Sequence, residues 1–394
     1  MASQTPYTIR WGIMATGWIA EIFCKDLLTN PAARGVHDVA HKIAAVASLQ
    51  GAARGAAFLK AIDGPSDAAT YGTYAELVAD PNVDIVYIAT PHSHHFQNAM
   101  LALEAGKNVL CEKALTVTQA QARKLVDKAK EKGVFFMEAV WTRFFPWSIK
   151  IRELVKAGEI GRVHRVFADL SVADDKGDGT LTWDDSHRMV NPDLAGGCLL
   201  DLGIYSLTWV FQILYHLQPE AAKEAPQVQS AVLNHPTTGV DEQTSIIAHF
   251  PTHRSTGIAT TALRVASDPD AQGSAGPAIR IQGTKGEIAI DHPAYRPQRY
   301  KVIRKGGEVE VVDVAPPKDE SRGGWGHGMF WEADECARCL RDGKKESEGM
   351  PWEESVVMMG VMEGTWRRGG VVYPDLITTD VYDPQSPLNV GRAS

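Results

Sequence analysis

The chain has 394 residues, of which 44% are hydrophobic and 22% charged, and its formal net charge is -8 at pH 7. A chain of this length is too long for one ordinary core, so we expect two packed domains with the composition of globular rather than disordered or fibrous proteins. The negative charge and the lack of a Lys/Arg-rich run argue against a nucleic-acid partner.

The cysteines and the N-terminal segment bear on the compartment. An odd number of scattered cysteines does not make the dense disulfide framework of a small secreted domain and fits a reducing compartment better. The N-terminal segment lacks the charged-then-apolar pattern of a signal peptide, and no window approaches the roughly 18 apolar residues that span a bilayer. We therefore expect a cytoplasmic protein with no membrane partner. The cysteines are Cys24, Cys111, Cys198, Cys336 and Cys339.

In the first third of the sequence, short apolar runs alternate with segments of helical periodicity such as 96–104 and 119–132. This alternation predicts βαβ units, in which right-handed helical crossovers join parallel strands of an open sheet. Ligands bind such sheets beyond the carboxyl ends of the strands. We therefore expect a dinucleotide-binding Rossmann domain over residues 1–145. Its expected strands are 9–14, 43–48, 85–90, 108–111 and 134–137.

After about residue 150, strand-like runs follow one another closely and predict a mostly antiparallel sheet with a helix at 202–215 against it. Residues 146–394 are therefore predicted to form an α+β domain, with further helices at 329–340 and 352–367 and an extended C-terminal arm from 373 onward. An open sheet needs its second face covered, so we expect an oligomer that covers this face. The expected strands are 163–172, 228–234, 244–250, 257–265, 278–282, 287–290, 300–303 and 309–312.

Directly after the first expected strand, small residues have the spacing of a dinucleotide-binding turn. In the pattern Gly/Ala-x-Gly-x-x-Gly/Ala, Ala15, Gly17 and Ala20 would permit the tight turn, the close approach of a pyrophosphate and the packing of helix on strand. The N–H groups at the start of the following helix would bind the phosphates. The residues of this predicted cofactor turn are Ala15, Thr16, Gly17, Trp18 and Ile19.

The end of the second strand bears on the choice of cofactor. NAD enzymes usually place an acidic residue there to bind the adenosine ribose, whereas this strand ends Ala47-Ser48-Leu49-Gln50. Ser48 could hydrogen-bond a 2′-phosphate and Arg54 could neutralise it, so the pattern favours NADP. The alternative is that Arg54 is a solvated side chain on a surface helix. Residues 30–41, before this strand, are interpreted as an inserted loop.

Further motifs occur at later strand ends and in the second domain. They are Thr90-Pro91-His92-Ser93-His94-His95, Cys111-Glu112-Lys113-Ala114, Glu138-Ala139-Val140-Trp141-Thr142-Arg143-Phe144, Ala195-Gly196-Gly197-Cys198-Leu199-Leu200-Asp201-Leu202-Gly203-Ile204-Tyr205, Gly283-Thr284-Lys285-Gly286 and Trp331-Glu332-Ala333-Asp334-Glu335. In these motifs the sequence resembles the Gfo/Idh/MocA oxidoreductase family, within it the branch of dimeric dihydrodiol dehydrogenases and fungal NADP-dependent D-xylose 1-dehydrogenases. The resemblance covers essentially the whole chain. One departure is Ala114, because the family normally has a proline there, which would preset the backbone beside the lysine.

The resemblance implies a catalytic lysine at Lys113 and a catalytic tyrosine at Tyr205. Oxidation of an alcohol by hydride loss needs a base for the hydroxyl proton, and a tyrosine, with an ordinary pKa near 10, serves only if its pKa is lowered. The Lys113 ammonium would favour tyrosinate, and Asp201 could orient the lysine or bind the sugar. Asp201 and Tyr205 are four residues apart on an expected helix and would share a face. Without the resemblance, we would interpret this pair as a solvent-facing helix surface.

The other expected contacts combine the resemblance with residue chemistry. Aromatic faces suit the C–H surface of a pyranose and guanidinium groups suit hydroxyls, although core packing is an equal alternative for each aromatic side chain. The cofactor contacts beyond the turn are Ser48, Arg54, Thr90, Pro91, His92, His95, Glu112, Lys113, Ala139, Trp141 and Arg143. The substrate contacts are Lys113, Arg143, Phe144, Trp183, Arg188, Asp201, Tyr205 and Phe330. No metal is expected, because the histidines at 92–95 and the Cys336–Cys339 pair lack a full set of zinc ligands.

Three functions are compatible with this sequence. The first is NADP-dependent oxidation of an aldopyranose, D-xylose above all, at C1 to the lactone. The second is oxidation of a trans-dihydrodiol to a catechol by the same residues. The third is a non-enzymatic sensor that binds NAD(P) without turning it over, and the presence of both Lys113 and Tyr205 argues against it.

Overall fold

The computed structural model describes residues 5–391, which form two compact units. The first unit consists of the N-terminal segment as far as Phe144, Pro316–Ser355 and the C-terminal segment from Thr378. The second unit consists of Phe145–Ala315 and Val356–Ile377. The structure thus differs from the predicted division after residue 145, because two later segments return to the first unit. Sequence pattern identifies helices in these segments but not the sheet on which they pack.

The first unit has a six-stranded parallel sheet in the order β3-β2-β1-β4-β5-β6. Its central strands β1 and β4 are nearly or fully buried toward their carboxyl ends, as expected of a sheet covered by helices on both faces. The sequence predicted every strand except β3, which has only three half-buried residues. The strands are β1 (Tyr7–Met14), β2 (Val39–Ala47), β3 (Ala69–Tyr71), β4 (Ile85–Ile88), β5 (Asn108–Glu112) and β6 (Phe136–Ala139).

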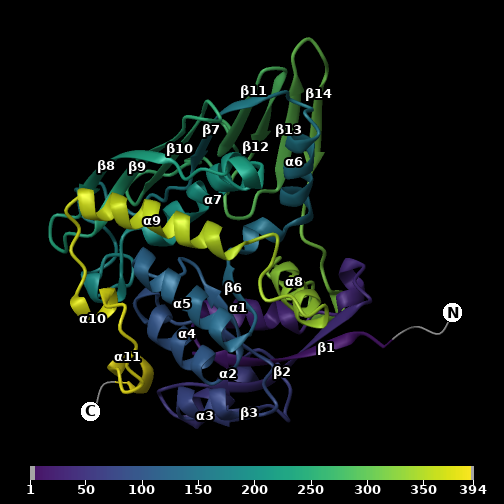
Figure 1. Ribbon diagram of the computed structural model, residues 1–394, viewed down its shortest axis with the longest axis vertical. Coiled ribbons are helices and arrows are strands. Elements are labelled where there is room, and N and C mark those ends of the chain that lie inside the picture. Colours follow the sequence, from purple (N-terminus) through teal and green to yellow (C-terminus); the bar gives the residue numbers. More distant parts are fainter. Residues whose placement is uncertain (1–4, 392–394) are drawn as a thin grey trace. The chain divides into compact units, whose positions relative to one another are not determined.

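Helices join the strands of this sheet, and two of them begin with capping boxes. The side chains of Thr73 and Thr118 accept the third N–H of α3 and α5, and Glu76 and Gln121 bind back to the cap residues. Helix α8 belongs to this unit and contacts β1 and β2 (Figure 1). The helices are α1 (Trp18–Leu27), α2 (Ala52–Ala61), α3 (Tyr74–Ala79), α4 (His95–Glu104), α5 (Gln119–Lys132) and α8 (Phe330–Arg341).

The C-terminal segment is not the extended arm that its Pro and Asp content predicted. It contains the short helices α10 (Asp375–Thr378) and α11 (Pro387–Val390). Its last part packs on α4, where Gln97 Nε2 donates to the carbonyl of Val381 at 2.8 Å and Asn98 Nδ2 donates to that of Leu388 at 2.9 Å. These amides satisfy the backbone of a segment that has no sheet or long helix of its own.

The second unit has an eight-stranded sheet in the order β14-β13-β12-β11-β7-β10-β9-β8. Only β7 and β10 pair in parallel; the other neighbours are antiparallel, so the predicted mostly antiparallel sheet is confirmed. Helix α7 packs on β7 and β10. The strands are β7 (Val163–Asp169), β8 (Gln227–Asn234), β9 (Asp241–Phe250), β10 (Ser255–Ala262), β11 (Ile279–Gly283), β12 (Gly286–Ile290), β13 (Arg299–Arg304) and β14 (Val309–Asp313). The helices are α6 (Pro146–Lys156), α7 (Ile204–Leu214) and α9 (Trp352–Arg368). The boundary between the units, after Ser355, lies within α9.

One helical stretch, Pro192–Leu214, contradicts the expectation that no segment could span a bilayer. It has 23 residues, and its most apolar 18-residue window has a mean hydropathy of 1.5, so by length and composition it could cross a membrane. In the structure, 83% of its most apolar window is buried. All residues of α7 are buried, so the apolar composition is accounted for by a core helix of the second unit.

Candidate active site

The turn between β1 and α1 has the geometry of a phosphate-binding turn. Gly17 is the cap residue of α1, and no side chain of residues 5–391 caps the first N–H groups of this helix. A Cβ on Gly17 would meet no protein atom within 4 Å, so the turn is open on that side. Trp18 is 67% exposed beside it, whereas Ala20 is fully buried against the sheet. The uncapped N–H groups and the open approach fit a dinucleotide pyrophosphate.

The residues proposed to select the cofactor lie next to this turn. Arg54 is exposed on α2, and its Nη2 donates to the carbonyl of Thr16 at 3.3 Å. Ser48 is 5% exposed at the end of β2, where its Oγ accepts the N–H of Gln50 at 3.2 Å. The structure therefore brings Arg54 to the predicted cofactor turn, and Ser48 ends the neighbouring strand.

The turns after β4 and β5 are joined by His95, which is fully buried. Its Nδ1 lies 2.9 Å from the carbonyl of Ala114 and its Nε2 lies 2.9 Å from that of Thr90. Burial lowers the pKa of His95 to about 4, against the opposite effect of the two carbonyls. The predicted direct contact of His95 with the cofactor is not supported; the ring instead links the Thr90-Pro91 turn to the turn that contains Lys113.

Lys113 follows β5, is half-buried, and precedes a cis peptide bond to Ala114. Its N–H donates to Glu112 Oε2 at 3.3 Å, and Glu112 also accepts the hydroxyl of Tyr87 from β4. Burial, together with the charge of Glu112, raises the pKa of Tyr87 well above its ordinary value, so Tyr87 remains a hydrogen-bond donor. Glu112 is 4% exposed and supports the lysine turn from inside the unit. His92, half-buried after β4, packs its ring edge-on against His95 at 5.6 Å.

Arg143, Phe144 and Phe330 are buried by other residues of the chain, and their contacts with a ligand stay predictions. Arg143 is fully buried and forms an ion pair with Glu354, and its Nη2 donates to the carbonyl of Gly349 at 2.8 Å. The ring of Phe144 packs so closely on Gly349 that a Cβ there would lie 2.8 Å from it. Phe330 is 1% exposed, and the guanidinium of Arg34 lies 4.8 Å from its ring centre.

No sequence motif pointed to His327, whose ring lies on that of a predicted cofactor residue. Its ring stacks on Trp141 with centroids 4.9 Å apart and planes at 17°. Trp141 is 4% exposed just after β6, where Ala139 is the last strand residue and is fully buried. Because Trp141 lies beyond a strand's carboxyl end, His327 is placed at the same edge of the sheet.

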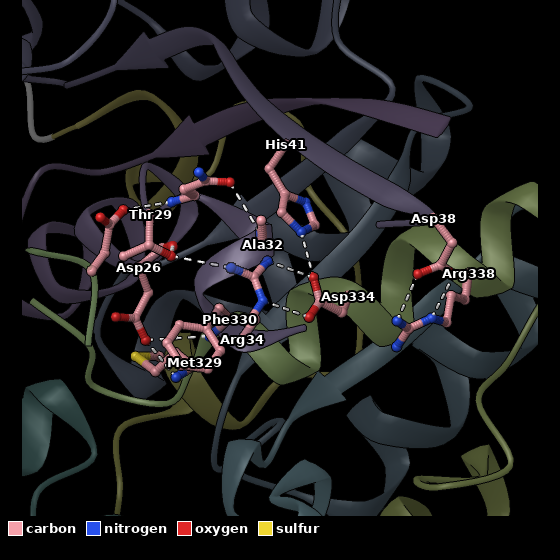
Figure 2. Close-up of polar contacts among 12 residues, drawn as sticks. Asp26, Thr29, Ala32, Arg34, Asp38, His41, Met329, Phe330, Asp334 and Arg338 are labelled. Carbon is pink, nitrogen blue, oxygen red and sulfur yellow. Dashed lines mark hydrogen bonds and ion pairs between the residues drawn. The ribbon is translucent and has the colours of Figure 1, made fainter. Parts of the chain in front are cut away.

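Asp26, at the carboxyl end of α1, holds the segment that carries His327. Its carboxylate accepts the N–H groups of His327, Gly328 and Met329 at 2.9, 2.8 and 2.6 Å, and the indole N–H of Trp325 at 2.8 Å. Figure 2 shows Asp26 facing Met329 and Phe330 at the start of α8. It serves as the N-terminal cap of a helix some 300 residues away in sequence. No local pattern marks such a cap, because its partner is distant in the chain.

In the second unit, Asp201 lies in a π-helical turn, Leu199–Gly203, which continues directly into α7. The sequence predicted an ordinary helix here and missed this turn, which is rarer and is often found at functional sites. Asp201 is 9% exposed, and Arg188 Nη1 donates to its Oδ1 at 3.1 Å. Tyr205 is the second residue of α7 and is 7% exposed. The structure therefore joins Asp201 to the predicted substrate residue Arg188.

The remaining predicted substrate residue, Trp183, lies in the same segment as Arg188. It is half-buried and stacks on His187, with ring centroids 5.2 Å apart and planes at 4°. The exposed Arg188 follows directly, so Trp183 and Arg188 belong to one surface segment. Among residues 5–391, no group of three or more His, Cys, Asp or Glu side chains could hold a metal ion.

Both units of the chain match models of known protein families. Residues 9–140 match the model of the oxidoreductase family with an NAD-binding Rossmann fold, and residues 148–289 match the GFO/IDH/MocA C-terminal domain. The chain is 66% identical over 393 residues to the D-xylose 1-dehydrogenase (NADP(+)) of Hypocrea jecorina, with 100% of both chains covered. It is 33% identical to human trans-1,2-dihydrobenzene-1,2-diol dehydrogenase, covering 93% of this chain and 98% of that protein.

The fold is also that of a solved sugar oxidoreductase. The structure of the aldose-aldose oxidoreductase from Caulobacter crescentus, solved with glycerol, matches with a TM-score of 0.72 at 23% identity, covering 92% of this chain and 98% of that one. At this level of identity the match shows a shared fold only.

Proposed function

Because the chain belongs to the Gfo/Idh/MocA oxidoreductase family, we propose that it oxidises D-xylose at C1 to the lactone, with NADP as the hydride acceptor. The observation that carries this proposal is the full-length 66% identity to an NADP-dependent D-xylose 1-dehydrogenase. The dihydrodiol dehydrogenases are half as similar, at 33% identity. Oxidation of a dihydrodiol is therefore the second candidate, and NAD(P) sensing without turnover is a third.

The first unit would bind NADP through its own backbone and side chains. The uncapped start of α1 would hold the pyrophosphate, and Arg54, with Ser48, would bind the 2′-phosphate. Bound NADP supplies the nicotinamide carbon that accepts the hydride. No carboxylate stands at the end of β2 to repel the 2′-phosphate, where the chain reads Ala47-Ser48-Leu49-Gln50.

The proton chemistry would belong to Tyr205, Lys113 and Asp201. Loss of hydride from C1 leaves a hydroxyl proton that must be taken up, and Tyr205 would take it as the base. The Lys113 ammonium would favour the tyrosinate form and hydrogen-bond the sugar oxygen. Asp201, paired with Arg188 at 3.1 Å, would bind a sugar hydroxyl rather than accept the proton, because an ion pair holds its charge.

The test is NADPH formation with D-xylose, D-glucose and a trans-dihydrodiol, measured by absorbance on the native chain, Lys113→Met and Tyr205→Phe. We expect D-xylose to be the best substrate and both variants to lose at least 100-fold in kcat, in line with the usual 10²–10⁴-fold contribution of acid–base groups. Matched controls are the exposed Lys60→Met and Tyr7→Phe. Unchanged turnover in both active-site variants would refute the mechanism. A higher rate with the dihydrodiol than with D-xylose would favour the dihydrodiol dehydrogenase. Binding of NADP without turnover of any substrate would favour the NAD(P) sensor.

We also propose that the chain is a cytoplasmic homodimer that pairs through the outer face of the second unit's sheet. Large apolar side chains are exposed on adjacent strands of this face: Leu233 of β8 is 55% exposed and Ile247 of β9 is 43% exposed. Large apolar side chains exposed on one sheet face favour contact with another protein surface. Sedimentation of the native chain should give twice the mass of one chain, and a monomer at micromolar concentration would contradict this proposal.

A further inference from the structure

The helix that carries Asp201 and Tyr205 begins at Leu199 without a cap from its own sequence. Cys198 stands at the cap position and makes no capping side-chain hydrogen bond. A helix start leaves N–H groups that need partners, and here the start is buried. The partner must therefore come from another part of the second unit.

Asp241, the first residue of β9, supplies that partner. Its Oδ2 accepts the N–H of Leu199 at 2.7 Å, the thiol of Cys198 at 3.0 Å and the hydroxyl of Thr244 at 2.9 Å. The carboxyl is fully buried, and burial raises its pKa to about 6. It is thus ionised at neutral pH, where a negative charge at a helix N-terminus is favourable.

The second oxygen of Asp241 fixes the chain just before the helix. Within the described part of the chain, Asp241 Oδ1 has no hydrogen-bond donor, and it faces Gly197, where a Cβ would overlap it. Gly197 has a φ of +117°, which only glycine adopts without strain. On the other side, a Cβ on Gly196 would lie 2.9 Å from the carbonyl oxygen of Arg188. The Gly196-Gly197 pair therefore runs tightly between Asp241 and the Arg188 turn.

These contacts link the start of the helix to Asp201 and to the Arg188 turn. Asp241 holds the start of the helix, the helix carries Asp201, and Asp201 binds the side chain of Arg188. The backbone of the Arg188 turn in turn abuts Gly196 and binds the chain again where the N–H of Gly197 donates to the carbonyl of Met189 at 2.8 Å. A shift of the helix start would therefore move Asp201 and Tyr205 together.

We propose that Asp241 is a positioning residue for the reaction: through the N–H of Leu199 it sets the place of the π turn and of Tyr205, without touching substrate or cofactor. This inference rests on the proposed roles of Asp201 and Tyr205. Catalytic groups displaced by about 1 Å lose on the order of 100-fold in rate. Binding of NADP, which is assigned to the α1 turn of the first unit, should not depend on Asp241.

The test compares Asp241→Ala, Asp241→Asn and Thr244→Val. Asp241→Asn keeps an oxygen that can accept the N–H of Leu199 but loses the charge, and Thr244→Val removes another donor to the same oxygen without touching the helix start. For turnover of D-xylose, we expect kcat to fall at least tenfold in Asp241→Ala, with partial recovery in Asp241→Asn and less than a twofold change in Thr244→Val. The Kd for NADP, from tryptophan fluorescence, should stay within twofold in all three.

A second measurement does not depend on turnover. Hydrogen–deuterium exchange of residues 199–205 should be faster in Asp241→Ala than in the native chain and near native in Asp241→Asn. If the native chain fails to oxidise D-xylose, the proposed function is wrong. The positioning role of Asp241 is then still decided by the order of the exchange rates in the three proteins and by kcat with whichever substrate the native chain does oxidise. A lowered Tm with unchanged kcat in Asp241→Ala and Asp241→Asn would show a purely structural cap and overturn the proposal.

Discussion

Arg54 is the single side chain on which the choice between NADP and NAD depends most. It is exposed, lies on the helix after β2, and reaches the cofactor turn by its hydrogen bond to Thr16. An exposed guanidinium is free to form a bidentate pair with a phosphate, which a neutral amide cannot replace. Its position therefore favours a role toward the 2′-phosphate over that of an unrelated surface residue.

We expect Arg54→Gln to raise the KM for NADP about tenfold, the lower end of what a hydrogen bond to a charged group contributes. The KM for NAD should not change, because NAD lacks the 2′-phosphate. Initial rates with both cofactors measure this, and Arg123→Gln, at another exposed arginine with an ion pair to Glu353, is the control. Equal effects on NADP and NAD would assign Arg54 to the stability of the turn instead.

At the same scale, the structure separates motif residues that support the site from those that face it. Lys113 is half-buried, whereas Arg143 and His95 of the same set of motifs are fully buried. Their motifs correctly predicted a position at a strand's carboxyl end. Whether the side chain then turns outward depends on partners such as Glu354 and the carbonyl of Ala114, which sequence spacing does not reveal.

Among the elements, the inserted segment before β2 is tied down by a buried ion pair. It contains a short 3-10 helix, Pro31–Arg34, and Arg34 donates to Asp334 of α8 from Nε and Nη2 at 2.8 and 2.7 Å (Figure 2). The two side chains are 2% and 0% exposed. The predicted insertion is therefore not a free loop, because Arg34 binds it to α8. This helix begins next to His327.

We expect Arg34→Ala to lower the free energy of unfolding by about 3 kcal/mol, because it leaves the Asp334 carboxylate buried without its guanidinium partner. The double variant Arg34→Leu/Asp334→Leu should lose less than Arg34→Ala, since it removes both charges. Urea denaturation followed by circular dichroism measures both. The exposed pair Arg299–Asp313 gives the control, where Arg299→Ala should cost under about 1 kcal/mol. Equal losses of unfolding free energy in Arg34→Ala and Arg299→Ala would show that the buried ion pair does not hold this segment on α8.

For the whole molecule, the same cluster predicts sensitivity to acid. His41 accepts the indole N–H of Trp11 on Nδ1 at 3.2 Å, so its proton is on Nε2, which donates to Asp334 at 2.9 Å. Burial lowers the pKa of His41, so the ring is neutral in the folded protein. The unfolded chain takes up this proton near pH 6.5. The contribution of His41 to the free energy of unfolding is therefore fully present above about pH 6.5 and is lost as the pH falls below this value.

The measurement is the urea midpoint at several pH values between 5 and 7.5, for the native chain and for His41→Gln. We expect the native chain to lose more stability than the variant as the pH falls from 6.5 to 5. The comparison is needed because Asp241, with a pKa raised to about 6 by burial, contributes the opposite slope in both proteins. Parallel curves for the two proteins would show that His41 does not titrate on unfolding.

The sequence by itself determined the two kinds of sheet, nearly all strands and the dinucleotide turn, because strand periodicity and turn spacing are local in the chain. The catalytic candidates came from its resemblance to a family of known chemistry. Only the tertiary structure decided where those elements go: α8 and the end of the chain return to the Rossmann unit. It also decided which motif residues are enclosed, such as Arg143 by Glu354, and which distant carboxylates, Asp26 and Asp241, cap the helices near the site. The physical reason is that burial and capping join residues from across the chain, so no local pattern carries them.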